Sequence, residues 1–293
     1  MPTISFDRAV DYYDNTRGFQ PGVAEQVRDA ILAYVHATPS TRFLELGIGT
    51  GRIALPFIEA GYVYDGIDIS GAMMAKLDQK LVDLAIAQGK RREDYRCELV
   101  EADITKPLPY ADSSYHVEIL VHVLHLIDDW QAVLQEAKRV LTPGGWILIV
   151  GTGNRQVDQV KHNETTQVAT HYSDPTAIRQ IRARWDEILQ TLGVDRNTYR
   201  SGGRADLPTI ESFLKTLGFT TELVDLLEYT QPPVSPRVMA DRIKGRMYSG
   251  EWELPDDIHA EAVKQFDQWF AESVTDPDVP LSGREVFRVL TAH

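Results

Sequence analysis

The chain has 293 residues and a single cysteine, Cys97, so a disulfide within one chain is excluded. This cysteine content fits a reducing compartment. Basic residues are also scarce, because 30 Lys and Arg stand against 43 Asp and Glu and leave a formal net charge of −13. Nucleic acids and anionic membranes attract proteins with excess positive charge. We therefore expect neither as a partner.

The sequence contains no apolar run near the roughly 18 residues that span a bilayer, and its first residues lack the basic and apolar pattern of a secretory signal. From these absences we expect a soluble, cytoplasmic, globular protein. His162 and His171 have no metal-ligand spacing to carboxylates, so we expect no metal site. The sequence contains no signal for an oligomeric state.

What the sequence does contain is a regular alternation of apolar runs and helical stripes. Apolar runs at about 41–46, 62–69, 97–102, 115–121 and 146–150 predict strands, and apolar residues three and four apart predict helices between them. Strands that alternate with helices form a parallel sheet covered on both faces. Runs at about 219–229 and 284–291 complete the predicted α/β fold, a mostly parallel sheet of seven strands.

We expect one domain over residues 1–293, with a cofactor-binding core at about 38–152. Segments at about 153–205 and 232–281 interrupt the alternation with loops and helices. We expect them to be helical insertions that cap the carboxyl edge of the sheet, where open α/β sheets bind ligands. Four cations of the second insertion fit either a solvated helix face or an anionic-substrate patch; they are Arg237, Arg242, Lys244 and Arg246.

The most informative stretch runs from Phe43 to Ile53 and is typical of a strand, a glycine-rich turn and a helix. Gly47, Gly49 and Gly51 have no side chains, so the backbone can bend sharply and a ligand can come close. The following helix offers free N–H groups to a polar part of that ligand. The Gly-x-Gly-x-Gly spacing differs from the Gly-x-Gly-x-x-Gly spacing of dinucleotide sites.

Acidic residues accompany this turn. Asp68 ends the second predicted strand about 20 residues later, where a carboxylate can accept hydrogen bonds from both ribose hydroxyls. Asp103 ends the third and can accept from an exocyclic amine such as that of adenine, with apolar Ile104 beside the ring. Glu45 would repel a pyrophosphate and suits a ligand with a positive end; as a buried acid without a role it would be costly. These features argue against NAD as the ligand.

As a set, the motifs resemble the class I S-adenosylmethionine-dependent methyltransferases that act on small molecules. The resemblance covers about residues 12–150 and rests on 45–51, on 66–70 with Met73, on 102–104, on 121–125 with 129–130, and on 141–145. Tyr13, Asp14 and Arg17 are similar to residues that often precede the core in small-molecule members. His116 departs from the family pattern, which usually has Asp there.

The resemblance implies a Rossmann-like fold with S-adenosylmethionine as cofactor. Its nucleoside would be held by Asp68 and Asp103 and flanked by Ile69 and Ile104. Its methionine part would lie against the glycine turn, with Arg17 at the carboxylate. The cofactor-binding residues that we predict are Arg17, Glu45, Gly47, Gly49, Gly51, Asp68, Ile69, Met73, Asp103, Ile104, Val121 and His122.

The implied reaction is in-line methyl transfer from the sulfonium to an oxygen, nitrogen or carbon of a small molecule. Alignment of the nucleophile supplies much of the rate, and a base is needed only if the nucleophile arrives protonated. His122 is the first candidate for a catalytic base, before Tyr13 and Tyr172; alternatively it is a wall residue or a satisfied core histidine.

Three other functions fit the same residues. One is a nucleotide-cofactor oxidoreductase on a similar sheet. Another is a non-catalytic protein that binds S-adenosylmethionine. The third is an enzyme of this fold that uses the cofactor for another reaction, such as aminopropyl transfer.

Overall fold

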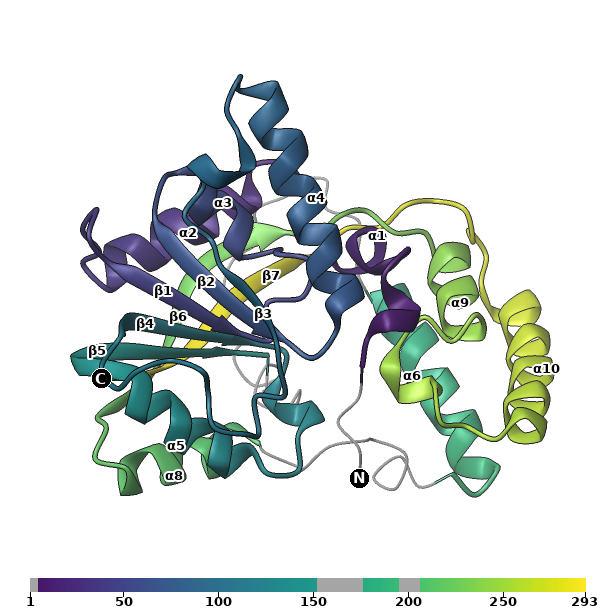
Figure 1. Ribbon diagram of the computed structural model, residues 1–293. Coiled ribbons are helices and arrows are strands. Elements are labelled where there is room, and N and C mark those ends of the chain that lie inside the picture. Colours follow the sequence, from purple (N-terminus) through teal and green to yellow (C-terminus); the bar gives the residue numbers. More distant parts are fainter. Residues whose placement is uncertain (1–4, 152–175, 195–205) are drawn as a thin grey trace, which may run out of the picture. The chain divides into compact units, whose positions relative to one another are not determined.

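The computed structural model describes residues 5–151, 176–194 and 206–293 (Figure 1). The chain divides into two compact units. The first contains Met1–Thr166, Gly202–Tyr229 and Val286–His293, and the second contains Gln167–Ser201 and Thr230–Glu285. The second unit corresponds to the two insertions expected from the sequence, although the insertion at 153–205 lies outside the described residues except for 176–194. The single domain and the capping role stay predictions.

Seven strands form one sheet in the order β3-β2-β1-β4-β5-β7-β6. Their bounds are β1 (Arg42–Leu46), β2 (Val63–Asp68), β3 (Leu99–Glu101), β4 (Tyr115–Val121), β5 (Leu141–Val150), β6 (Thr221–Thr230) and β7 (Arg284–Ala292). Strands β1 to β5 are parallel, and β7 runs antiparallel to β5. The predicted seven-stranded, mostly parallel α/β fold is confirmed. The strand order reverses between β1 and β4, the kind of position where such sheets bind ligands.

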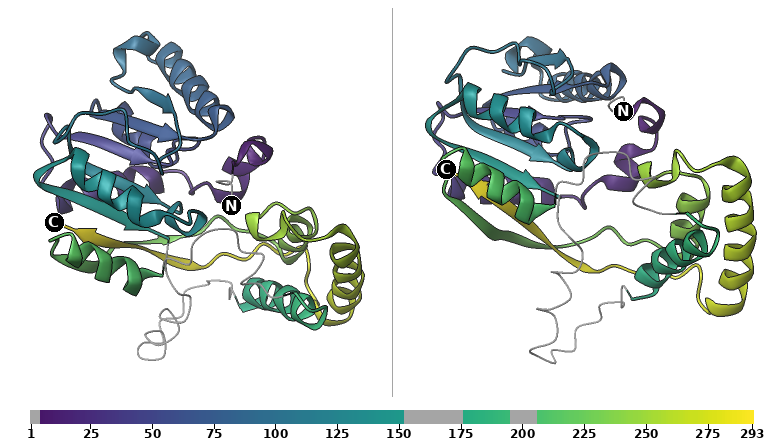
Figure 2. Two further views of the ribbon diagram at one scale, coloured as in Figure 1. Left: turned by 60° about the horizontal axis from the view of Figure 1, so that its bottom comes forward. Right: turned by 90° about the horizontal axis from the view of Figure 1, so that it is seen from below.

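The side chains of each strand alternate between two cores, one on each face of the sheet. Phe43 of β1 packs with helices α2 (Val23–Tyr34), α3 (Ala54–Glu59) and α4 (Gly71–Ala87). Its neighbour Leu44 packs on the opposite face, with α5 (Trp130–Val140) and α8 (Leu207–Thr216). Figures 1 and 2 show α5 and α8 side by side on that face. This period of two makes the sheet a two-sided scaffold.

One predicted turn is part of a strand instead. The sequence around Pro143 and Gly144 predicts a tight turn before the fifth strand, but β5 already begins at Leu141. Tyr115 pairs with Leu141 and Val117 pairs with Trp146, so the extra residues form an irregularity within β5. Gly144 has a φ of 74°, which lets the strand bulge without breaking its pairing with β4.

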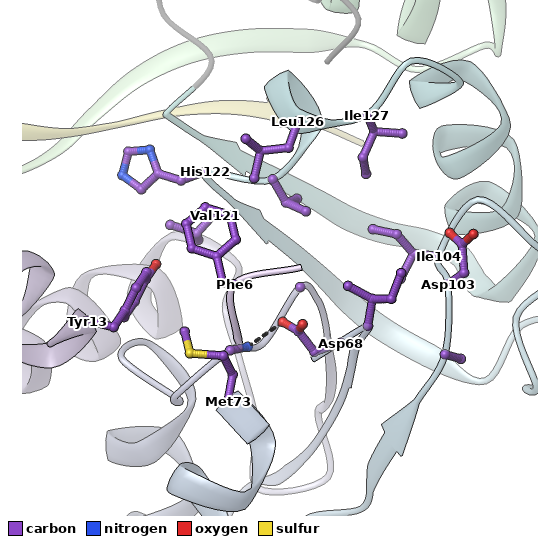
Figure 3. A pocket seen from close by; sticks show the side chains of 15 residues that line it. Phe6, Tyr13, Asp68, Met73, Asp103, Ile104, Val121, His122, Leu126 and Ile127 are labelled. Atoms are coloured by element: carbon purple, nitrogen blue, oxygen red, sulfur yellow. Dashed lines mark hydrogen bonds between the residues drawn. The ribbon is translucent and has the colours of Figure 1, made fainter. Parts of the chain in front are cut away.

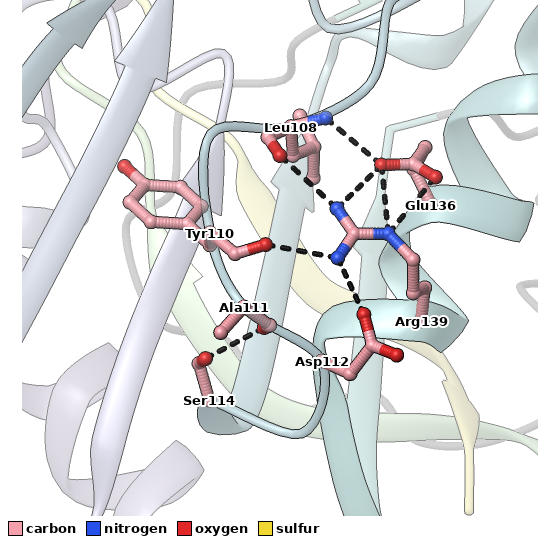
Figure 4. Close-up of polar contacts among 7 residues, drawn as sticks. All are labelled: Leu108, Tyr110, Ala111, Asp112, Ser114, Glu136 and Arg139. Carbon is pink, nitrogen blue, oxygen red and sulfur yellow. Dashed lines mark hydrogen bonds and ion pairs between the residues drawn. The ribbon is translucent and has the colours of Figure 1, made fainter.

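A network of polar contacts closes the loop before β4 (Figure 4). Arg139 of α5 donates to the carbonyls of Leu108 and Tyr110, and it pairs with Asp112 and Glu136. Glu136 in turn accepts from the backbone N–H of Leu108 at 2.8 Å. One arginine therefore fixes the path of residues 108–112 against the end of α5.

The second unit is helical within its described residues. Helices α6 (Thr176–Thr191), α9 (Pro236–Lys244) and α10 (Asp256–Ser273) surround a core that contains Trp185 and Phe266. Arg237, Lys244 and Arg246 pair with Asp278, Asp267 and Asp256 of the same unit at 2.6, 2.9 and 2.8 Å. These pairs favour a solvated helix face over an anionic-substrate patch.

The remaining described elements are short: η1 (Asp7–Ala9), α1 (Tyr13–Arg17), η2 (Arg92–Asp94), η3 (Leu124–Leu126) and η5 (Ser249–Glu251). Within the described ranges, no helix has the length and apolar character that crossing a lipid bilayer requires.

Candidate active site

A pocket opens in the first unit, where β1, β2, β3 and β4 end (Figure 3). It is lined by Phe6, Tyr13, Gly47, Gly49, Asp68, Ile69, Met73, Ala102, Asp103, Ile104, Val121, His122, Val123, Leu126 and Ile127. Most of the predicted cofactor-binding residues therefore lie around one cavity. Arg17, Glu45 and Gly51 are not among its lining residues.

The glycine turn adopts a backbone that other residues rarely adopt. The φ angles of Gly47, Gly49 and Gly51 are 86°, 54° and 76°. A Cβ on Gly47 would lie 2.9 Å from a methyl group of Val123, so a side chain there would narrow the pocket. A Cβ on Gly51 would instead collide with Leu77 of α4. Glycine is thus required at position 51 for packing beneath the turn, because this position faces Leu77 and not the pocket.

Asp68 connects the end of β2 to the glycine turn. Its Oδ2 accepts from the N–H of Gly49 and its Oδ1 from the N–H of Ser70, both at 2.8 Å. Burial raises the pKa of this carboxyl and the nearby Asp7 adds to the rise, whereas the backbone donors oppose it. Since each carboxylate oxygen can accept more than one hydrogen bond, Asp68 keeps acceptor capacity toward the pocket.

Asp103 follows β3 at the opposite end of the pocket. Its Oδ1 accepts from the N–H and the hydroxyl of Thr105, at 2.9 and 2.8 Å. Within the described part of the chain, Oδ2 has no partner. Ile104 beside it is buried in the apolar core. An acceptor next to apolar surface suits an aromatic ring that bears an amine, so these residues fit the adenine of the implied cofactor.

Glu45 lies beneath the turn and not in the pocket. It is 3% exposed, and the hydroxyl of Tyr64 donates to its Oε2 at 2.8 Å. Burial raises the pKa of Glu45 to about 8, against the opposing effects of Tyr64 and Arg52. Arg17 is likewise outside the pocket lining, and its carbonyl accepts from Arg52 Nη1 at 2.9 Å.

His122 follows β4 in a left-handed conformation, with a φ of 54°. Its N–H donates to the carbonyl of Val150 at 2.9 Å, and its ring lies where a Cβ on Gly151 would be. The residue as a whole is exposed to solvent, yet the protein atoms around its ring disfavour the charged form. Together with Arg52 and His125, they lower the pKa of His122 to about 3. His122 is therefore a neutral wall residue near pH 7.

The pocket also contains residues that the sequence analysis did not assign to it. Phe6 lies against Tyr13, with ring centroids 6.0 Å apart in an edge-to-face arrangement. Leu126 and Ile127 come from the segment after β4. The aromatic N-terminal segment and the apolar residues after His122 were visible in the sequence, but only their contacts assign them here. No group of potential metal ligands occurs among the described residues, and the absence of a metal stays a prediction.

The strand order, the glycine turn and the two aspartates at strand ends define a Rossmann-like domain with a pocket for a nucleoside-type cofactor. A sequence model of the family described as "Methyltransferase domain" matches residues 44–149, which contain the glycine turn, both aspartates and strands β2 to β4. Residues 44–149 therefore form a methyltransferase domain of the class I S-adenosylmethionine-dependent type, and the cofactor of this domain is S-adenosylmethionine.

Relatives in sequence match about half of the chain. An uncharacterized protein of Methanocaldococcus jannaschii is 29% identical over 144 residues, which cover 49% of this chain and 59% of that protein. Sterol 4-C-methyltransferase strm-1 of Caenorhabditis elegans is 27% identical over 125 residues, covering 42% and 35%. Demethylmenaquinone methyltransferase of Renibacterium salmoninarum is 28% identical over 145 residues, covering 49% and 55%. The chain thus spans less than two thirds of each relative.

Solved structures share the fold over more of the chain. A candidate methyltransferase of Bacillus halodurans has a TM-score of 0.52 at 15% identity and covers 93% of this chain and 98% of its own. The cyclase SpnF has a TM-score of 0.50 at 16% identity and covers 98% and 92%. At these identities the likeness establishes the fold alone.

Proposed function

We propose that the protein transfers the methyl group of S-adenosylmethionine to a small molecule by in-line displacement at the sulfonium. The observation that carries this proposal is one pocket that combines the glycine turn, Asp68, Asp103 and His122. The first three features fit the cofactor, and His122 lies at the end of β4 on the same cavity. The net charge of −13 favours a small molecule over a nucleic acid.

In this proposal Asp68 accepts from the ribose hydroxyls, and Asp103 Oδ2 accepts from the adenine amine. Ile69 and Ile104 flank the ring. When bound, the cofactor supplies an already activated methyl group. The remaining task of the protein is to hold the acceptor in line and to exclude water.

Direct measurement separates this function from its alternatives. We expect calorimetry to detect binding of S-adenosylmethionine and S-adenosylhomocysteine, and mass spectrometry of an acceptor panel to detect products heavier by one methylene unit. Tight NAD binding without S-adenosylmethionine binding would instead support an oxidoreductase. Binding without turnover across a broad panel would support a non-catalytic protein. Since SpnF has this fold and is a cyclase, product mass is the decisive readout.

We further propose that the neutral ring of His122 accepts the proton of a hydroxyl nucleophile while methyl transfer makes that proton strongly acidic, because a weakly basic imidazole can take a proton only from such a group. Replacing His122 with alanine is expected to lower turnover by roughly 100-fold, the size of a general-base contribution, while cofactor affinity changes by less than about threefold. Because the folded pKa is about 3, the ring stays neutral from about pH 5 to pH 8, and His122 adds no acid limb to the rate profile there. A limb near neutrality that disappears in His122→Ala would contradict the lowered pKa, and wild-type turnover in His122→Ala would contradict the role as a base.

A further inference from the structure

The N-terminal strap, defined here as residues 5–19, forms one wall of the pocket. Phe6 and Tyr13 belong to it and line the cavity (Figure 3). Ala9 between them is buried, at 1% exposed, so the strap packs against the first unit. A ligand that fills the pocket therefore contacts the strap as well as the sheet edge.

Asp14, Thr50 and Lys80 fasten the strap to the glycine turn. The Thr50 hydroxyl donates to Asp14 Oδ1 at 2.6 Å, and Lys80 Nζ of α4 lies 2.7 Å from Asp14 Oδ2. Lys80 Nζ also donates to the Thr50 carbonyl at 2.8 Å, so each of the three residues contacts the other two. Because Tyr13 precedes Asp14 directly, any displacement of Asp14 also displaces a wall of the pocket.

Two further contacts hold the strap at its ends. The hydroxyl of Ser70 donates to Asp7 Oδ1 at 2.5 Å and accepts from the N–H of Met73 at 3.1 Å. At the other end, the Arg52 guanidinium lies 5.0 Å from the centre of the Phe19 ring. The strap is thus attached to the segment after β1, to Ser70 after β2 and to helix α4.

The Asp14–Lys80 ion pair is more exposed to solvent than the Thr50 side chain beside it. The side chains of Lys80 and Asp14 are 28% and 37% exposed, whereas Thr50 is 1% exposed. An ion pair at this exposure is partly screened by salt, so Asp14 and Lys80 hold the strap through the pair together with their hydrogen bonds to Thr50. The ion pair can therefore break while the buried Thr50 keeps the glycine turn in place.

We propose that Asp14 and Lys80 are positioning residues that hold the N-terminal strap closed over the cofactor pocket, so that breaking their contact limits release of the cofactor and of its demethylated product. The identity of this ligand rests on the proposed function. The contacts of Asp14 with Lys80 and Thr50, called the latch here, lie within the protein itself. Strap opening can therefore be measured without any ligand.

The first test measures dissociation of S-adenosylhomocysteine from the wild type and from Asp14→Asn and Lys80→Met. Both variants are expected to release it at least about tenfold faster, a change of about 1.4 kcal/mol, and Lys80→Arg is expected to restore most of the wild-type rate. Release from the wild type is expected to speed up with salt more than release from Asp14→Asn. Asp78→Asn is the matched control, because it removes the other ion pair of α4, with Arg92 at 2.7 Å, outside the pocket.

The second test measures amide hydrogen exchange of the unliganded protein in residues 13–18. Exchange there is expected to accelerate about tenfold in Asp14→Asn and Lys80→Met, with β4 unchanged. Wild-type release and wild-type exchange in both variants would overturn the latch. If Asp14→Asn fails to fold, Lys80→Met and its Lys80→Arg rescue decide the question. Failure of the wild type to bind S-adenosylhomocysteine would reject the proposed function, while hydrogen exchange would still test the latch.

Discussion

Replacing Asp68 with alanine is expected to weaken binding of S-adenosylhomocysteine by at least about 100-fold. Each hydrogen bond to a charged group contributes roughly 1.5–3 kcal/mol, and the proposal assigns two ribose hydroxyls to this carboxylate. The variant also loses the bond from Asp68 Oδ2 to the N–H of Gly49, which holds the glycine turn against the end of β2. Calorimetry on the folded variant measures the loss.

Asp65 provides the control on the same strand. It is buried, accepts from the N–H of Glu98 at 3.0 Å and from the Tyr115 hydroxyl at 2.9 Å, and does not line the pocket. Asp65→Asn is expected to lower the melting temperature while leaving the affinity of the folded protein within about threefold of wild type. Unchanged affinity in Asp68→Ala would reject the site assignment.

Replacing Glu118 with methionine is expected to raise the free energy of unfolding by about 2 kcal/mol at neutral pH. Glu118 is 0% exposed on β4, between Leu44 and the side chains of α5, and neither carboxyl oxygen has a partner within the described part of the chain. Burial raises its pKa well above the usual range, against the attraction of Arg139. Methionine has a similar length and needs no hydrogen bond.

The pH dependence of stability gives an independent measure of the same group. Above the ordinary glutamate pKa of about 4.5, the unfolded chain loses the proton of Glu118 while the folded protein keeps it. The free energy of unfolding of the wild type therefore falls as pH rises, by up to about 1.4 kcal/mol per pH unit for each such group. Glu118→Met is expected to remove one group from this slope, and Glu45 continues to contribute up to its folded pKa of about 8.

Urea unfolding from about pH 5 to about pH 8 checks both effects. Glu136→Gln is the control: because Arg139 lowers the pKa of Glu136 below its ordinary value of 4.5, this group changes the slope only below the tested range, and Glu136→Gln is expected to keep the wild-type slope. An unchanged slope in Glu118→Met would show that the folded protein holds this carboxyl ionised.

The sequence predicts the local parts of this molecule well, because they depend on short spacings. Ser70 is of a residue type that caps helices and accepts from the N–H of Met73, and Asp68 stands at the end of its strand as expected. The direction of the Glu45 side chain could also have been predicted, from the alternation of side chains along its strand. Because side chains alternate along a strand, Glu45 shares a face with Phe43 and points into the core beside Tyr64.

Contacts between distant segments were not predictable in the same way. Phe6 lies far from the glycine turn in sequence, and no local period indicates that it lines the pocket. Gly51 lies in the turn as predicted, but glycine is needed there because a side chain would collide with Leu77 of helix α4. Only the packing of the helices over the sheet defines these relationships.

The tight fit between His122 and Gly151 has an evolutionary consequence. A side chain at position 151 would overlap the imidazole ring, so position 151 cannot gain a side chain while His122 stays in place. We expect the two positions to covary among close relatives: where residue 151 carries a β-carbon, residue 122 should be small. Relatives that keep both His122 and Gly151 would be those that retain the proposed role of His122.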